Sequence, residues 1–247
     1  MTTYSLKFSL SQAGLAALAS AQEKVCVVKS VNGTVSNVVW LSIKPFLENS
    51  IEFNEAYGLY ASSTQIQKGA KISRISNVAS CSKGHQYPFL DAGYFGSANS
   101  STAKGYGIVN HYGEALTFGL TQTAIVNGKS VDSELNATTV LNNQMADYTP
   151  IVTLSIYVAA SLNNGSVFSE ISGEPLTLTY TSDTEKIIHF DDTQNIFYGD
   201  DSIDQEKDWF STLIHNVEET IYINLIFIQY KYDGNAWGDK KYISEPN

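Results

Sequence analysis

The chain has 247 residues, a formal net charge of −10 and 43% hydrophobic residues, a composition that excludes a globally disordered protein. Only 16% of its residues are charged, and its 15 lysines and arginines are scattered, so they cannot neutralise a run of phosphates. We therefore expect neither nucleic acid nor an anionic membrane as a partner. The polar residues that replace the charges are 28 Ser, 19 Thr, 18 Asn and 10 Gln.

The first twenty residues predict a strand followed by a short helix. Tyr4, Leu6, Phe8 and Leu10 alternate as one face of a strand, and the Ala-rich stretch after them begins with the capping-box spacing Ser9-x-x-Gln12. The same stretch imitates a signal peptide that ends in Ala19-Ser20-Ala21, but polar residues interrupt its apolar part. We expect a protein that is cytoplasmic in the producing cell or released without a signal peptide.

Turn signals between apolar segments predict β-hairpins. Asn-Gly or Asp-Gly pairs occur at Asn32, Asn127, Asn164 and Asp233, and such pairs suit the positive φ angles of type I′ turns. The expected strands flank these turns, and further candidates are 50–62, 70–76, 175–181 and 186–190. Their number and spacing predict an all-β fold: an antiparallel β-sandwich or jelly roll of roughly ten strands.

The C-terminal part predicts an amphipathic helix and a buried strand. Ser202 and Gln205 form a capping pair, and Phe210, Leu213, Ile214 and Val217 follow helical spacing. The strand 221–232 that follows is apolar on both faces near its end, so we expect it to be central. No linker divides the chain, and we interpret residues 1–247 as a single domain. Uninterrupted apolar runs such as 225–228 are far too short for a transmembrane helix.

Two cysteines and several aromatic residues suit a structural role. Cys26 lies in an apolar run and is expected to be buried, while Cys81 lies in a polar loop, so nothing requires an oxidising compartment. Trp40, Phe89 and Phe118 lie in strand-like segments and are expected in the core.

The segment Tyr87–Gly119 has the composition of a recognition surface. It interleaves aromatic residues with Gly, Ser and Asn, a mixture that combines rigid rings with adaptable hydrogen-bonding groups. The same mixture suits a sugar, whose C–H face stacks on an aromatic ring. A structural role for these aromatics in the core stays open as the alternative. The candidate ligand-binding residues are Tyr94, Phe95, Tyr106, His111, Tyr112 and Trp237, the last at a predicted hairpin tip.

Acidic residues concentrate between Asp191 and Asp208. Asp191, Asp192, Asp200 and Asp201 are candidate Ca²⁺ ligands, because hard cations prefer several converging carboxylates. Their spacing does not match an EF-hand, and ordinary solvated acids are the alternative. We expect no other cofactor.

No motif indicates catalysis. The chain lacks G-x-S-x-G and H-E-x-x-H, and Gly128-Lys129-Ser130 lacks the first glycine of a phosphate-binding loop, where Thr123 stands. In general type the sequence resembles cytosolic lectins and actinoporin-like cytolysins, although no motif of either family aligns with it. The predicted function is therefore non-enzymatic recognition of a neutral glycan or a lipid headgroup.

The alternative function is self-assembly into a filament, a lattice or a crystalline inclusion. The threonine-rich segment 116–126 is nearly free of charge and lacks the lysine or proline that usually blunts an exposed edge strand. We expect Thr117, Thr121 and Thr123 to line such an edge, and we expect a homo-oligomer.

Overall fold

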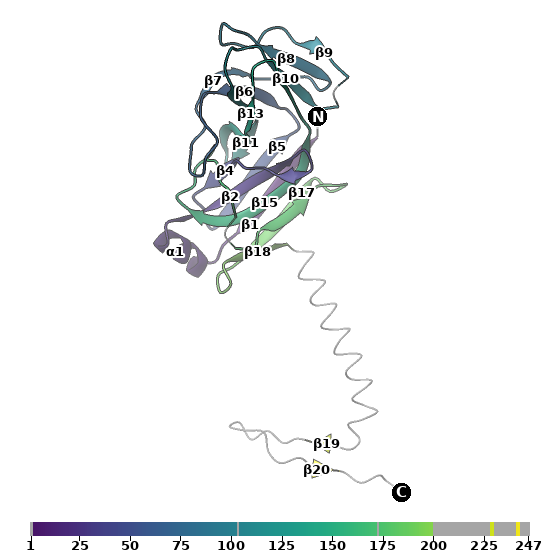
Figure 1. Ribbon diagram of the computed structural model, residues 1–247. Helices are drawn as coiled ribbons and strands as arrows, with labels where there is room; N and C mark the ends of the chain where they lie inside the picture. Colours follow the sequence, from purple (N-terminus) through teal and green to yellow (C-terminus); the bar gives the residue numbers. More distant parts are fainter. Residues whose placement is uncertain (1, 103, 172, 200–227, 230–240, 243–247) are drawn as a thin grey trace. The chain divides into compact units, whose positions relative to one another are not determined.

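The fold is built almost wholly from β-strands. The computed structural model describes residues 2–102, 104–171, 173–199, 228–229 and 241–242 (Figure 1). The chain divides into two compact units, Met1–Gly199 and Asp200–Asn247, so the single-domain expectation stays a prediction. The first unit contains three sheets, and the second contains the pair β19 (Ile228–Gln229) and β20 (Lys241–Tyr242).

The largest sheet has nine strands in the order β18-β17-β1-β5-β11-β6-β7, with β12 and β13 also paired to β11. Antiparallel pairs predominate, but β1 and β17 run parallel, which the prediction of an antiparallel fold did not anticipate. The bounds are β1 Thr3–Ser9, β5 Glu48–Asn54, β6 Gly58–Ser62, β7 Arg74–Val78, β11 Leu116–Val126, β12 Lys129–Glu134, β13 Thr138–Val140, β17 Glu185–Asp191 and β18 Ile196–Gly199.

Two smaller sheets complete the first unit. One has the order β16-β15-β2-β3, with β4 also paired to β2, and its strands are β2 Glu23–Val31, β3 Thr34–Val35, β4 Leu41–Ile43, β15 Pro150–Ala160 and β16 Leu176–Thr179. The other has the order β14-β10-β8-β9, with β8 and β10 parallel, and lies at one end of the unit in Figure 1. Its strands are β8 His85–Phe89, β9 Asn99–Ser100, β10 Tyr106–Asn110 and β14 Met145–Tyr148.

The N-terminal strand and helix form as expected, but the helix begins at a different cap. Helix α1 spans Gln12–Ser20, and its N-cap is Ser11, whose hydroxyl oxygen accepts a hydrogen bond of 2.9 Å from the Gly14 backbone N–H. The capping-box prediction placed this role two residues earlier, at Ser9, where β1 ends. The predicted C-terminal helix lies outside the described residues.

Two of the predicted hairpins are confirmed. Asn32 and Gly33 have φ angles of 55° and 78°, Asn127 and Gly128 have 48° and 78°, and each pair joins antiparallel strands. At Gly165 the φ angle is 73°, but the segment after it forms isolated bridges rather than the predicted hairpin strand. The predicted strand 50–62 is divided into β5 and β6 by the segment Glu55–Tyr57.

The main hydrophobic core takes residues from all three sheets. Phe8, Ile51 and Leu120 from the nine-stranded sheet pack with Val27 and Leu154 from the five-stranded sheet, and all five are fully or almost fully buried. The prediction that Trp40, Phe89 and Phe118 belong to the core is confirmed, since each is 0% exposed. Cys26 is also fully buried, and Cys81 is half-buried with a free thiol.

The expectation that the threonine-rich strand forms an exposed edge is wrong. Strand β11 is paired with β5 and β6 on one side and with β12 and β13 on the other, so it lies inside the sheet. Thr117 and Thr121 are each 3% exposed. The strand needs no lysine or proline to prevent edge-to-edge association, because its neighbours already satisfy its backbone.

We therefore expect Thr121→Lys to unfold the domain partly rather than to disrupt an assembly. Thr121 is buried beside Gly58 with no room for a longer side chain, so a lysine there would overpack the sheet and lower the free energy of unfolding by about 1–3 kcal/mol. Thr123→Lys on the same strand is the matched control, because Thr123 is exposed, and should change it by less than about 0.5 kcal/mol. Urea denaturation of both variants measures this, and equal midpoints would contradict the assignment of β11 to the interior.

Candidate functional site

The candidate site is built around an irregularity between β5 and β11. Phe53 pairs with Ala124, and Gly58 pairs with Thr121. Between these two pairs, the four residues 54–57 face only Gln122 and Thr123 on β11. Such extra residues bend a strand and interrupt its hydrogen-bond ladder, and they often lie beside functional sites.

The Gln122 side chain supplies one hydrogen bond where the ladder is interrupted. Its Nε2 donates to the backbone carbonyl of Asn54, a group that lies where the regular ladder stops. The Asn54 side-chain oxygen in turn accepts a hydrogen bond of 3.1 Å from the Ala56 backbone N–H. These two contacts hold the irregular segment in place.

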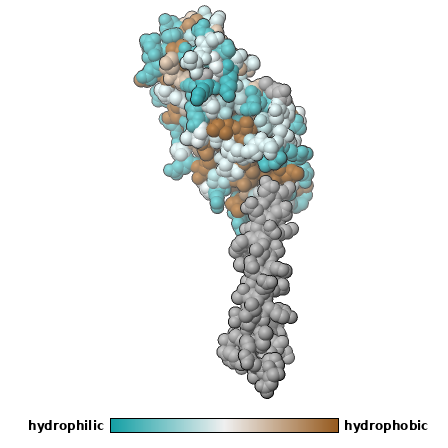
Figure 2. Space-filling model, turned by 90° about the vertical axis from the view of Figure 1, so that its right-hand side faces the viewer, coloured by the Kyte–Doolittle hydropathy of each residue, from teal (hydrophilic) through white to brown (hydrophobic). Residues whose placement is uncertain are grey.

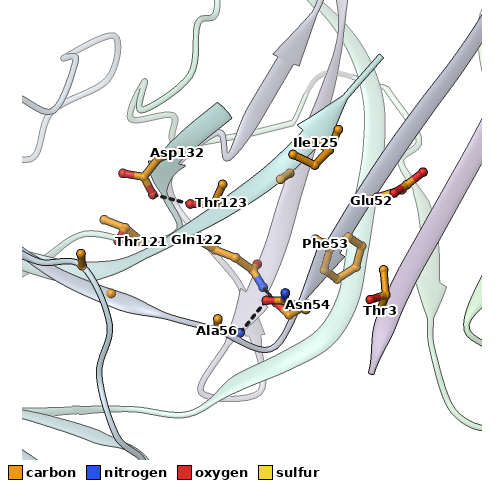
Figure 3. Close-up of a pocket in the computed structure, with 13 residues that line it drawn as sticks. Thr3, Glu52, Phe53, Asn54, Ala56, Thr121, Gln122, Thr123, Ile125 and Asp132 are labelled. Carbon is orange, nitrogen blue, oxygen red and sulfur yellow. Dashed lines mark hydrogen bonds between the residues drawn. The ribbon is translucent and has the colours of Figure 1, made fainter. Parts of the chain in front are cut away.

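A pocket of about 400 Å³ opens beside this segment (Figure 3). Its lining offers the carboxylates of Glu52 and Asp132, the side chain of Asn54 and the hydroxyl of Thr123, with Ile125 as an apolar surface. Glu52, Thr123, Ile125 and Asp132 are exposed, so these groups are accessible to a ligand. The pocket therefore presents hydrogen-bond acceptors and donors around a small apolar area.

Arg74 fixes the orientation of Asp132. The guanidinium of Arg74, on β7, donates to Asp132 Oδ2 at 2.6 Å and to Glu134 Oε1 at 2.5 Å. Thr123 Oγ1 donates to the other Asp132 oxygen at 3.4 Å (Figure 3). The Glu134 side chain is only 10% exposed, so this ion pair is shielded and anchors the rim of the pocket.

On the core side of the same irregularity lies a buried lysine. Lys29, on β2, is 0% exposed, and its Nζ donates to Gln122 Oε1 at 2.9 Å and to Tyr57 Oη at 3.0 Å. The Nζ also lies 5.7 Å from the ring centre of Trp40, 4.8 Å from that of Phe53 and 5.0 Å from that of Tyr57. Three aromatic faces and two polar atoms thus surround the amine.

The alternation of the strands explains why this lysine is buried. Val25, Val27 and Val31 on β2 belong to the main core, and Lys29 follows the same period of two. On β11, Gln122 likewise shares its face with the core residues Leu120 and Ala124. Lys29 and Gln122, one from each of two sheets, therefore occupy core-facing positions at which the alternation of the strands predicts apolar side chains.

Burial controls the protonation of Lys29. Loss of hydration lowers the pKa of Lys29 from 10.5 to about 7, although the negative charge of Glu55 acts in the opposite direction. Desolvation and the charge of Glu55 raise the pKa of the neighbouring Tyr57 far above its ordinary value. The tyrosine is therefore a neutral hydroxyl, and the amine is partly neutral at physiological pH.

The described aromatic residues predicted to bind a ligand differ in exposure. Tyr94 is 54% exposed, whereas Tyr106 is 7% exposed and packs its ring against Tyr57 at 5.4 Å. Phe95 and Tyr112 are half-buried, and both contact the ring of Phe89.

His111 and Trp237 are the two remaining ligand candidates. His111 is exposed, with its Nδ1 at 3.4 Å from Asn143 Oδ1. Trp237 lies outside the described residues. Of the six candidates, Tyr94 and His111 are thus the described ones with solvent-exposed side chains.

The described members of the acidic cluster already have partners in the fold. Asp191 Oδ1 accepts from the backbone N–H groups of Thr193 and Gln194, and Asp192 Oδ2 accepts from the Ser11 hydroxyl at 2.7 Å. Asp200 and Asp201 lie outside the described residues. Among the residues that are described, no group of three or more His, Cys, Asp or Glu side chains could hold a metal ion. Calcium binding stays a prediction.

Sequence reasoning missed the central residues of this site. One signal was visible: Lys29 interrupts the apolar alternation of Val25, Val27 and Val31. No comparable signal marked Tyr57 or Gln122, because their roles depend on strand pairing across long sequence distances.

Comparison of the chain with protein families, with curated proteins and with solved structures gave no match. Within the part of the chain that the structure describes, no helix is long and apolar enough to cross a membrane.

For the chain with a free Lys29 amine, we expect stability to rise with pH. The lowered pKa means that unfolding takes up a proton between pH 7 and 10.5, so acidification favours the unfolded state. Between pH 7 and 8.5 this group should add about 1.5 kcal/mol to the free energy of unfolding.

The matched control is Lys29→Met, which keeps the apolar stem and removes the titrating group. Urea titrations of both proteins at pH 7 and 8.5 give the change in unfolding free energy between the two pH values. Subtracting the change in the variant from that in the wild type removes the contributions of Cys26 and Cys81, which both proteins share. A pH dependence that is the same in both proteins would show that Lys29 is not titrating in the core.

Proposed function

We propose that this chain is a non-enzymatic binding protein that recognises a neutral glycan, and that the pocket between β5 and β11 holds one of its sugar units. The observation that carries the proposal is the lining of that pocket. It combines the carboxylates of Glu52 and Asp132 with the side chain of Asn54 and the Thr123 hydroxyl. Its volume of about 400 Å³ lies within the range of small-molecule sites.

Sugar hydroxyls are donors and acceptors at once, so they suit carboxylates and amides that are held in fixed positions. Arg74 holds Asp132, and the Ala56 backbone N–H holds the Asn54 side chain, so little ordering remains to be done when a ligand binds. Ile125 offers apolar contact to the C–H face of a ring. The two carboxylates disfavour a phosphate or another anion, which supports a neutral ligand.

The aromatic surface is a secondary element of this proposal. Tyr94 is the exposed aromatic side chain of the Tyr87–Gly119 segment and could stack on a further sugar unit or on a lipid headgroup. On the face that Figure 2 shows, hydrophobic side chains of the first unit form small groups among hydrophilic ones. This pattern favours a soluble ligand over broad insertion into a lipid surface.

The fold suits such a role if the two larger sheets form a β-sandwich, which we infer from the residues they share in one core. The alternative of self-assembly loses its specific support, because β11 lies inside its sheet. The strands that end the three sheets, β3, β7, β9, β14, β16 and β18, have at most five residues each, and β12, which pairs only with β11, has six, which limits pairing with another copy. A homo-oligomer stays a prediction.

A glycan array with three variants tests the proposal. Thr123→Trp places a large side chain in the pocket and should abolish binding, whereas Thr123→Val, which replaces the hydroxyl with a methyl group of similar size, should weaken it by about 1 kcal/mol. Thr177→Trp is the matched control, because Thr177 is another exposed strand threonine outside the pocket lining, and it should bind normally.

A fourth variant, Tyr94→Ala, separates the pocket from the aromatic surface. We expect it to bind the same glycans with reduced affinity. Full binding by Thr123→Trp together with complete loss in Tyr94→Ala would move the site to the Tyr87–Gly119 segment. Absence of any glycan ligand for the wild-type chain would overturn the proposal.

A further inference from the structure

The interior of the first unit contains an amine that lacks a counterion. None of the ion pairs among the described residues includes Lys29, whose Nζ is fully enclosed by side chains. An isolated buried charge is expensive, and such a group normally loses its proton or acquires an acidic partner. The core offers instead a carboxamide at hydrogen-bond distance.

The amine and the carboxamide are held in direct contact. Lys29 Nζ donates to Gln122 Oε1 at 2.9 Å, the oxygen that is bonded to the amide carbon. The Gln122 side chain is itself fixed, because its Nε2 donates to the Asn54 carbonyl. Its backbone carbonyl accepts a hydrogen bond of 3.1 Å from Trp40 Nε1. Fixing two groups in contact replaces much of the entropy cost of a reaction between them.

We propose that Lys29 and Gln122 join in an intramolecular isopeptide bond. The neutral Nζ attacks the Gln122 amide carbon, and a bond forms between Nζ and that carbon. The bond from the carbon to Nε2 then breaks. One proton leaves Nζ through the Tyr57 hydroxyl, 3.0 Å away, and reaches Nε2, which departs as ammonia. Atoms and charges balance without an oxidant or any other co-reactant.

The surroundings favour two parts of this step, the neutral state of the amine and the exclusion of water. Burial provides the neutral nucleophile, because the pKa of Lys29 falls to about 7. The rings of Trp40, Phe53 and Tyr57 exclude the water that would otherwise compete as a nucleophile. The product has no charge, so the energetic penalty of the buried amine disappears.

The bond would join β2 of the five-stranded sheet to β11 of the nine-stranded sheet, between residues 93 positions apart in the chain. A covalent link that closes so long a loop restricts the unfolded chain and thereby favours the folded state. The proposal does not rest on the glycan site, since no ligand takes part, although the departing Nε2 is the atom that donates to the Asn54 carbonyl beside the pocket.

Intact-mass measurement under denaturing conditions tests the proposal directly. The purified full chain, incubated at pH 8.5, should be lighter than its sequence by the mass of one ammonia molecule. Digestion should yield one branched peptide that contains residues 29 and 122. Tyr57→Phe should slow the reaction roughly a hundredfold, the usual contribution of a proton-transferring side chain.

The control variants are Lys29→Met and Gln122→Met, which should keep the full mass. They also exclude a different source of ammonia loss, the succinimide that can form at Asn-Gly pairs such as Asn32-Gly33. An unmodified wild-type mass after incubation, or an ammonia loss that persists in Lys29→Met, overturns the proposal. If a variant fails to fold, the wild-type peptide map decides alone.

Discussion

The placement of Lys29 between two sheets is the constraint on which the rest of the site depends. An amine in an apolar interior needs polar atoms within reach, and the regular pairing of strands would supply none. The four residues 54–57, set against two on β11, bring Tyr57 to the amine. The same irregularity allows Gln122, on the core face of β11, to accept the second hydrogen bond that the Lys29 amine donates. The distorted ladder thus gives a buried amine its polar partners.

The outer pocket and the inner amine are consequences of one distortion. Gln122 connects them, because its Oε1 faces Lys29 while its Nε2 holds the carbonyl of Asn54, a residue of the pocket lining. The hydrogen bonds of the core therefore determine the position of groups at the surface. A rigid interior behind a small polar pocket reduces the ordering that a ligand must impose, which is how a modest set of contacts acquires specificity.

Local features of this fold were predictable, and long-range features were not. The hairpins at Asn32 and Asn127 followed from two adjacent residues, and the core positions of Trp40 and Phe118 followed from the strand-like segments that contain them. The interior position of β11 depends on four partner strands that the sequence pattern cannot identify. The pocket was equally hidden, since the segment Asn54–Tyr57 has no glycine or proline to mark an irregularity. Composition also could not distinguish the exposed Tyr94 from the buried Tyr106, because orientation is a property of the assembled sheets.

A lysine at a core position also restricts how the sheets can assemble. If β2 shifted by one residue, Lys29 would exchange faces with Val28, which packs with Val39 and Phe168 in a separate apolar cluster. On that face the amine would lose its contacts with Tyr57 and Gln122, and the shifted register would carry an unpaired charge. An apolar residue at position 29 would fit either face nearly equally well. The buried amine therefore destabilises the shifted register of β2 more than it stabilises the native one. Its effect is to make the native register the single favoured arrangement, not to raise the stability of that arrangement.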